Sequence, residues 1–234
     1  MSSNVRITFL GHSAFKIISP KGHIIYIDPF LSQNPSTPAE YKSPDKADFI
    51  LLTHGHEDHV GDTLEIAKTT AATVVSTVEL SGLLKADGLA EQQAAEFNKG
   101  GTLQFDDFSV TLTNANHSSS FGGRYAGEAG GLVIRFSDGP TIYHAGDTSI
   151  MPDFSLYAEL YAPYISMLPI GDHYTMGPVE AAMAASMLRS KIFIPIHFGT
   201  FPVLTGSPDV FKTETEKRTG GASQVTILKP GESL

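Results

Sequence analysis

Alternating apolar and polar residues mark short strands near the start of the chain. The pattern predicts strands over residues 5–10, 14–18 and 23–27, and Ser19-Pro20-Lys21-Gly22 is typical of the turn between the last two. Short, mainly apolar runs bounded by polar or turn residues predict buried strands. These runs lie at residues 49–52, 165–168 and 192–196.

Helical patterns follow in the later parts of the chain. They predict helices over residues 62–70, from a cap at Ser76 or Thr77 to about Ala86, and over 154–161, 178–188 and 209–218. Strands predominate at first and then alternate with helices, in two rough cycles. This order predicts an α/β fold of two packed sheets flanked by helices. Since no linker or long repeat interrupts it, we expect one domain over residues 1–234.

Composition narrows the classes of partner. The chain has 234 residues, of which 41% are hydrophobic, enough for a sizeable core. Its formal net charge of −9 opposes an extended grip on nucleic acid, so we expect no such partner. The absence of cysteine excludes disulfides and thiolate metal ligands. We see no signal-peptide pattern and no apolar stretch of membrane-spanning length, which indicates a cytoplasmic protein.

Four residues of metal-ligand type crowd into residues 53–59, directly after a predicted buried strand. In an extended segment His54 and His56 point the same way, because side chains two positions apart share a face. Asp58 and His59 are adjacent and must diverge, so they suit a second ion. The alternative, a solvated histidine-rich loop, is disfavoured by the density of ligand types after a buried strand.

Three further ligand-type residues, His117, Asp147 and His197, also follow predicted strands, at residues 108–113, 141–143 and 192–196. Taken singly, His117 is compatible with a solvated histidine, Asp147 with a turn residue and His197 with a core histidine. In α/β folds, however, ligand sites collect at the carboxyl ends of strands. Their shared position therefore favours metal ligation together with residues 54–59.

The order H-x-H-x-D-H of residues 54–59 resembles the metal-binding signature of the metallo-β-lactamase superfamily. The resemblance covers essentially the whole chain and implies a four-layer αββα sandwich. It also implies two divalent metal ions and their ligands: His54, His56 and His117 for one ion, Asp58, His59 and His197 for the other, and Asp147 as the bridge.

Other segments resemble one branch of this superfamily, the metal-dependent hydrolases. The matching segments are residues 11–13, 146–148 and 171–173. This branch includes ascorbate-6-phosphate lactonase-like proteins and N-acyl-phosphatidylethanolamine phospholipase D-like proteins. Redox di-iron members place Glu where His56 stands and add a flavin-binding domain, and neither feature is found here.

Four residues outside the ligand set are candidates for supporting roles. Asp28 can accept a hydrogen bond from a ligand histidine, or simply end its strand in an Asp-Pro turn. His12 resembles a residue near the site in the same branch, or is a polar loop residue. His173 can contact substrate or protonate a leaving group. Arg124, in a glycine-rich loop expected at residues 121–131, is a candidate anchor for an anionic substrate group or a solvated surface arginine.

These observations predict an enzyme that hydrolyses a small molecule, and an anionic substrate is one of the options. A metal-bridging hydroxide would attack an ester, lactone or phosphodiester, with Asp58 steering its proton and His173 protonating the leaving group. Zinc suits imidazole-rich sites, but mixed His/Asp sites also take manganese, iron or nickel, and the resembled lactonases point towards manganese. Two alternatives stay open: a catalytically silent metal-binding or scaffold protein, and a superfamily nuclease. The resemblance is compatible with a homo-oligomer.

Overall fold

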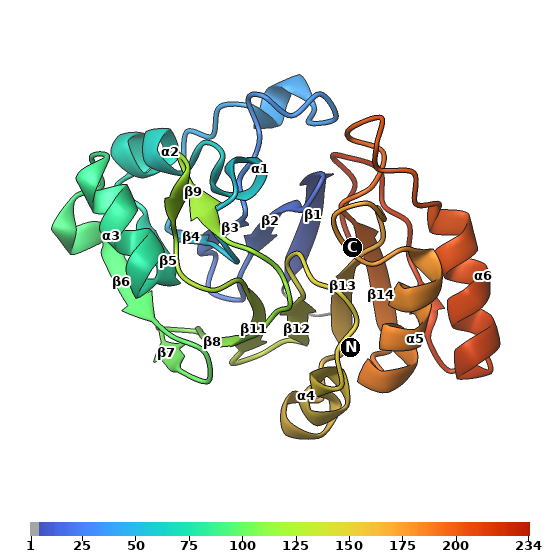
Figure 1. The fold of residues 1–234 in the computed structure, drawn as a ribbon. Coiled ribbons are helices and arrows are strands. Elements are labelled where there is room, and N and C mark those ends of the chain that lie inside the picture. Colours follow the sequence, from blue (N-terminus) through green and yellow to red (C-terminus); the bar gives the residue numbers. More distant parts are fainter. Residues whose placement is uncertain (1–4) are drawn as a thin grey trace.

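Two β-sheets form the centre of the fold (Figure 1). In this computed structural model, which describes residues 5–234, the six strands of the first sheet lie side by side in sequence order. Its first three strands are antiparallel and the rest continue in parallel. The strands are β1 (Arg6–Gly11), β2 (Ala14–Ile18), β3 (Ile24–Ile27), β4 (Phe49–Leu51), β5 (Thr73–Thr77) and β6 (Ala94–Phe97).

The second sheet has seven strands in the order β15-β14-β13-β12-β11-β8-β7. Strands β12 to β15 are parallel, and the remaining pairs are antiparallel. Two short strands, β9 and β10, form a separate hairpin. The strands are β7 (Thr102–Gln104), β8 (Phe108–Asn114), β9 (Ser120–Phe121), β10 (Arg124–Tyr125), β11 (Gly130–Phe136), β12 (Thr141–His144), β13 (Ile165–Pro169), β14 (Ile192–Ile196) and β15 (Gln224–Val225).

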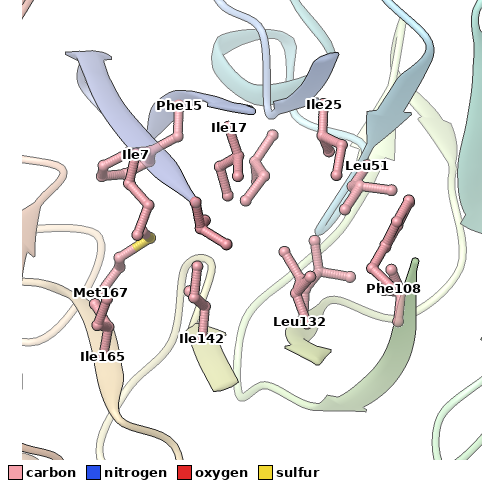
Figure 2. Close-up of a cluster of buried hydrophobic side chains, with 14 of the residues drawn as sticks. Ile7, Phe15, Ile17, Ile25, Leu51, Phe108, Leu132, Ile142, Ile165 and Met167 are labelled. Carbon is pink, nitrogen blue, oxygen red and sulfur yellow. The ribbon is translucent and has the colours of Figure 1, made fainter. Parts of the chain in front are cut away.

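Apolar side chains fill the space between the two sheets. Figure 2 shows Ile7, Ile17 and Ile25 of the first sheet in one cluster with Ile142 and Met167 of the second. All five are buried, and burying such a side chain contributes about 1.5–3 kcal/mol. This shared core holds the sheets face to face.

Helices cover the outer faces, which confirms the expected αββα sandwich (Figure 1). The helices are α1 (Glu57–Val60), α2 (Thr63–Thr70), α3 (Val78–Ala86), α4 (Asp153–Tyr161), α5 (Pro178–Leu188) and α6 (Pro208–Thr219), with 3-10 turns at Ala39–Tyr41 and Glu91–Gln93. Ile66 and Leu80 of α2 and α3 pack with the first sheet, and Phe154 and Phe211 of α4 and α6 pack with the second. Within residues 5–234 no helix is both long and apolar enough to cross a bilayer.

Residues 121–131, expected as a flexible loop, instead contain the hairpin strand β10 and the start of β11. Gly122 and Gly123 have φ angles of 56° and 71°, which suits a two-residue hairpin turn. Gly130 lies inside β11, where an added Cβ would come within 2.6 Å of Leu112. The glycines therefore serve a tight turn and close strand packing, and the composition of the segment alone concealed its strands.

The strand order brings several strand ends to one rim of the sandwich. β4, β12 and β14 all end just before predicted ligands. β1 runs parallel to β3, and β8 parallel to β12, because a single antiparallel strand separates the members of each pair. The loops that follow β1, β3, β4, β8, β12 and β14 therefore emerge where ligand sites form in such folds.

Candidate metal centre

All seven predicted metal ligands meet at this rim. Their nitrogen and oxygen atoms form three overlapping groups, and within each group the atoms lie within 4.8 Å of one another. The groups are His54, His56 and His117; His12, Asp58, His59 and His197; and His54, His59 and Asp147. The first two groups match the expected division between two ions, and His12 is an addition to the second.

The first group consists of His54, His56 and His117. His54 Nε2 and His56 Nδ1 are 3.0 Å apart, and the ring of His117 lies 5.2 Å and 5.1 Å from the rings of His54 and His56. His56 has extended backbone angles (φ −66°, ψ 148°) and immediately precedes α1. The extended segment thus turns His54 and His56 to the same side, as their spacing predicted.

Asp28 orients ligands of both groups. Its Oδ2 accepts a hydrogen bond from His59 Nδ1 (2.7 Å) and another from Thr53 Oγ1 (2.6 Å). Because the Thr53 hydroxyl donates to Asp28, it accepts from His54 Nδ1 (3.0 Å). In the neutral form that binds a metal, both histidines then carry their proton on Nδ1, and each Nε2 lone pair can face the ion.

Asp147 lies between the two groups and is buried. Its Oδ1 is 3.3 Å from His59 Nε2, and its Oδ2 is 3.0 Å from His197 Nε2 and 3.5 Å from His117 Nε2. The carboxylate therefore contacts members of both sets. This is the position that a bridging ligand between two cations requires.

Burial keeps the first group of histidines neutral. It lowers the pKa of His54, His56 and His117, because the charged ring loses solvation. Metal binding requires the neutral imidazole. These three residues are therefore in the binding form at pH 7.

Nearby carboxylates shift the pKa of His59 in the direction opposite to burial. Burial tends to lower the pKa of His59, but the carboxylates of Asp147 and Asp28 outweigh it and raise that pKa well above its usual value. Burial tends to raise the pKa of Asp147, yet His197 and His59 bring it well below its usual value. Without a metal, His59 and Asp147 thus form a buried pair of opposite charges.

His12 supports Asp58 from the end of β1. A carboxylate only accepts, so His12 Nε2–H donates to Asp58 Oδ2 (3.1 Å) and His12 Nδ1 accepts from Thr200 Oγ1 (3.0 Å). Burial lowers the pKa of His12 to about 4. The ring is therefore neutral at pH 7 and belongs to the site, whereas the alternative of a polar loop residue does not apply.

Uncommon backbone angles occur in the same place. His12, Asp28 and His197 have φ angles of 58°, 44° and 55°, a region that costs a non-glycine residue about 1–3 kcal/mol. The backbone N–H of His197 donates to the carbonyl of His12 (2.8 Å), which ties two of these residues together. Such strain persists only where the surroundings hold it, and it is typical of functional sites.

His173 and Arg124 do not belong to the three ligand groups. His173 is exposed, and its ring packs against Tyr174 at a centroid distance of 4.4 Å. The Arg124 guanidinium pairs with Asp87 and lies 5.9 Å from the centre of the Phe121 ring. The ion pair with Asp87 occupies the guanidinium that was expected to anchor an anion. Proton donation by His173 stays a prediction.

A cavity of about 460 Å³ opens beside the cluster. It is lined by Phe30, Ser32, Gln33, Glu57, Asp58, Gly61, Asp62, Phe121 and Phe201. Asp58 belongs both to this wall and to the second ligand group. The cavity is of small-molecule size and is the space from which a substrate can reach the cluster.

The unpaired polar atoms of the cluster suit bound cations. His59 Nε2 and Asp147 Oδ1 are buried, and neither makes a well-aligned hydrogen bond within residues 5–234, although they are only 3.3 Å apart. An unsatisfied buried polar atom costs about 1–3 kcal/mol. A divalent ion would satisfy both, and mixed imidazole and carboxylate donors are the ligands that first-row divalent metals accept.

Comparisons with known proteins agree with this geometry. Residues 23–198 match the family model for the Beta-lactamase superfamily domain. A UPF0173 metal-dependent hydrolase of Koribacter versatilis (strain Ellin345) is 46% identical, over 98% of this chain and 97% of its own. Another, of Rubrobacter xylanophilus, is 43% identical, over 100% and 98% of the two chains.

A solved structure extends the similarity to the fold. Igni18, a metallo hydrolase from the hyperthermophilic archaeon Ignicoccus hospitalis, is 36% identical and covers 98% of this chain and 97% of its own, with a TM-score of 0.87. The chain therefore belongs to the beta-lactamase superfamily, in its UPF0173 group of metal-dependent hydrolases.

Proposed function

We propose that this chain uses two divalent cations to hydrolyse an ester, lactone or phosphodiester of a small molecule. The observation that carries the proposal is the meeting of seven ligand-type side chains from both sheets beside a cavity. One ion would be held by His54, His56 and His117, the other by Asp58, His59 and His197, and both by Asp147.

Two cations bound here would acidify a water molecule into a nucleophile and polarise the oxygen under attack. Zinc is the first expectation because of the many imidazoles, and manganese, iron and nickel are the competing expectations.

The chain's own residues position these ligands and handle the proton. Asp28 aligns His59 directly and His54 through Thr53, which keeps their lone pairs directed inward. His12 holds Asp58 in place. Because Asp58 also lines the cavity, it is the carboxylate placed to accept a proton from the attacking water and return it to the leaving group.

Metal analysis combined with activity assays tests this proposal. We expect about two equivalents of divalent metal per chain, hydrolysis of at least one class in an ester, lactone and phosphodiester panel, and loss and recovery of activity on chelation and reloading.

His117→Ala should lose about one equivalent of metal and reduce kcat at least about a hundredfold. His23→Ala, at a half-buried histidine near Asp48 and Asp106 that belongs to none of the ligand groups, is the matched control. A metal-loaded protein that hydrolyses none of the three classes would contradict the proposal.

A further inference from the structure

The cavity beside the cluster has an aromatic side. Phe30, Phe121 and Phe201 come from three distant parts of the chain and line it together. The rings of Phe30 and Phe201 are 6.3 Å apart, and each meets the edge of the buried His12 ring, at 5.9 Å and 5.6 Å. Aromatic walls of this kind bind apolar or aromatic groups, and they offer no hydrogen bonds to a polar one.

The rest of the lining is acidic. Glu57, Asp58 and Asp62 all face the cavity, and among the described residues that line it there is no lysine or arginine. Asp62 accepts hydrogen bonds from the backbone N–H groups of Leu31 and Ser32 (2.8 Å each). Glu57 is exposed and forms no ion pair with any residue in the range 5–234. The acidic groups therefore stay available to repel an anion.

The arginine that the sequence suggested as an anion anchor is already engaged. Arg124 pairs with Asp87, which follows α3, and so holds the β9–β10 hairpin that carries Phe121. Its guanidinium is thus used to place an aromatic wall. Lys42 donates from Nζ to the carbonyl of Ser32 (3.2 Å) but does not itself line the cavity.

The net charge of the metal-loaded cluster does not outweigh the acidic lining of the cavity. Two divalent cations would be largely offset by the nearby carboxylates of Asp28, Asp58 and Asp147, which leaves about one positive charge. That charge faces Glu57 and Asp62 across the cavity. An anionic substrate would meet repulsion there, whereas an uncharged one would meet none.

We propose that the site acts on uncharged carboxylic esters or lactones that carry an aromatic or bulky apolar group, and that it discriminates against anionic esters and phosphodiesters. This inference rests on the proposed hydrolase function. The apolar group lies among Phe30, Phe121 and Phe201, and Glu57 and Asp62 supply the discrimination.

The same charges favour release of the product. Water adds its oxygen to the acyl carbon, the bond from that carbon to the ester oxygen breaks, and the alcohol leaves with one proton of the water. The acid that forms loses the other proton and becomes a carboxylate. The acidic lining repels this new anion, so the site holds a neutral substrate better than its product.

A matched pair of substrates tests the charge preference. 4-Nitrophenyl butyrate and 4-nitrophenyl hemisuccinate release the same phenol and differ mainly in a terminal carboxylate, and bis(4-nitrophenyl) phosphate represents the phosphodiesters. With metal-loaded protein at low ionic strength we expect kcat/KM for the butyrate to exceed the other two by at least about tenfold. Glu57→Gln should reduce the ratio of kcat/KM for the butyrate to kcat/KM for the hemisuccinate several-fold. Glu79→Gln, at an exposed position of α3 outside the cavity lining, should leave this ratio unchanged.

A binding measurement gives a second readout that does not depend on turnover. Butyrophenone and 3-benzoylpropionate are non-hydrolysable and differ in the same terminal group. We expect chelated protein, in which no metal can bind the carboxylate, to prefer butyrophenone about tenfold, and Phe121→Ala to weaken its binding.

The possible failures are distinguishable. Turnover that favours the hemisuccinate or the phosphodiester would overturn this inference and leave the hydrolase function standing. Absence of turnover with these three substrates and with the lactones of the panel, together with a retained preference for butyrophenone, would contradict the hydrolase function and support the ligand class of the cavity. Equal binding of the two ketones would overturn the inference whatever the activity.

Discussion

Asp28 aligns one ligand of each proposed ion although it belongs to neither ligand group. It ends β3 with a positive φ of 44° and accepts hydrogen bonds from Thr53 and His59. Through Thr53 it also sets the tautomer of His54. One buried carboxylate therefore aligns a ligand of each proposed ion, a role in which even small chemical changes affect the metal.

We predict that Asp28→Asn lowers metal affinity about 10–100-fold in a protein that still folds. The carboxylate accepts from the Thr53 backbone N–H on Oδ1 and from the Thr53 hydroxyl and His59 on Oδ2. The amide has one acceptor oxygen in place of two, so its NH2 group must face at least one of these donors. Competition with a chromogenic chelator measures the affinity. Asp106→Asn, at an exposed carboxylate paired with Lys21, is the control, and an unaltered affinity in D28N would show that Asp28 has no part in orienting ligands.

The raised pKa of His59 predicts proton release on metal binding. In metal-free protein, Asp147 and Asp28 keep His59 protonated at pH 7 despite its burial. A metal ion must displace this proton, so His59 should release about one proton and the apparent affinity should rise with pH up to the raised pKa. Titration calorimetry in two buffers of different ionisation enthalpy measures the release. Binding heats independent of the buffer at pH 7 would contradict it.

The stability of the metal-free protein depends on pH in the opposite direction to its metal affinity. Because the pKa of His59 is raised in the folded state, its ion pairs stabilise the metal-free protein fully below the unfolded value of about 6.5. That contribution is lost as pH rises through the folded pKa. Metal-free protein should therefore gain stability, relative to metal-loaded protein, as pH falls from 8 towards 6.5.

At the scale of elements, α1 explains how one short segment serves two ions. The backbone is extended through His56 and becomes helical at Glu57. Adjacent side chains on a helix point about 100° apart, so Asp58 and His59 diverge. Asp58 faces the cavity and His12, whereas His59 is buried towards Asp28 and Asp147.

A second element, α3, lies away from the site and contains an exposed glycine. An added Cβ at Gly82 would meet nothing within 4 Å, and its φ is not positive. We predict that Gly82→Ala raises the free energy of unfolding by about 0.5–1 kcal/mol, because alanine loses less backbone entropy in a helix. Urea denaturation measures the change.

The control for this prediction distinguishes the room available for a Cβ atom from the effect of the backbone φ angle. Gly123, in the β9–β10 turn, also has nothing within 4 Å of an added Cβ but has a φ of 71°. Gly123→Ala should therefore destabilise by about 1 kcal/mol. If G82A destabilised the protein as much as G123A, the argument from helix entropy would fail.

At the scale of the whole molecule, the cluster joins the two halves of the sandwich. His54, Asp58 and His59 follow a strand of the first sheet, whereas His117, Asp147 and His197 follow strands of the second. Bound cations would therefore connect both sheets across the end of their shared core. Their effect should appear in global unfolding and not only in the loops.

We predict that chelation lowers Tm by about 10–20 °C. Each of two ions present at a hundred times its Kd stabilises the native state by about 2.7 kcal/mol, and a chain of this size shifts by about 2–4 °C per kcal/mol. Calorimetry with and without chelator measures the change, and His117→Ala should show a smaller shift. A Tm that stays constant after metal removal, verified by elemental analysis, would contradict this coupling.

The pattern along the chain determined much of this protein. Strand and helix positions followed from local hydrophobicity, and ligand types after strand ends predicted which residues would meet at the rim. Both inferences succeed because the burial of a strand and the side to which each side chain points depend on residues that are close in sequence. The resemblance carried by residues 54–59 then implied the sandwich, which the structure and the family both confirm.

Only the tertiary structure decided how the site is supported and what surrounds it. The hydrogen bonds of Asp28 to Thr53 and His59, the contact of His12 with Asp58, and the pairing of Arg124 with Asp87 all join separate segments. Strand order and backbone angles such as the positive φ of His12 set these contacts, and neither leaves a mark in hydrophobic periodicity. For the same reason the aromatic and acidic cavity became visible only when three distant phenylalanines were brought together.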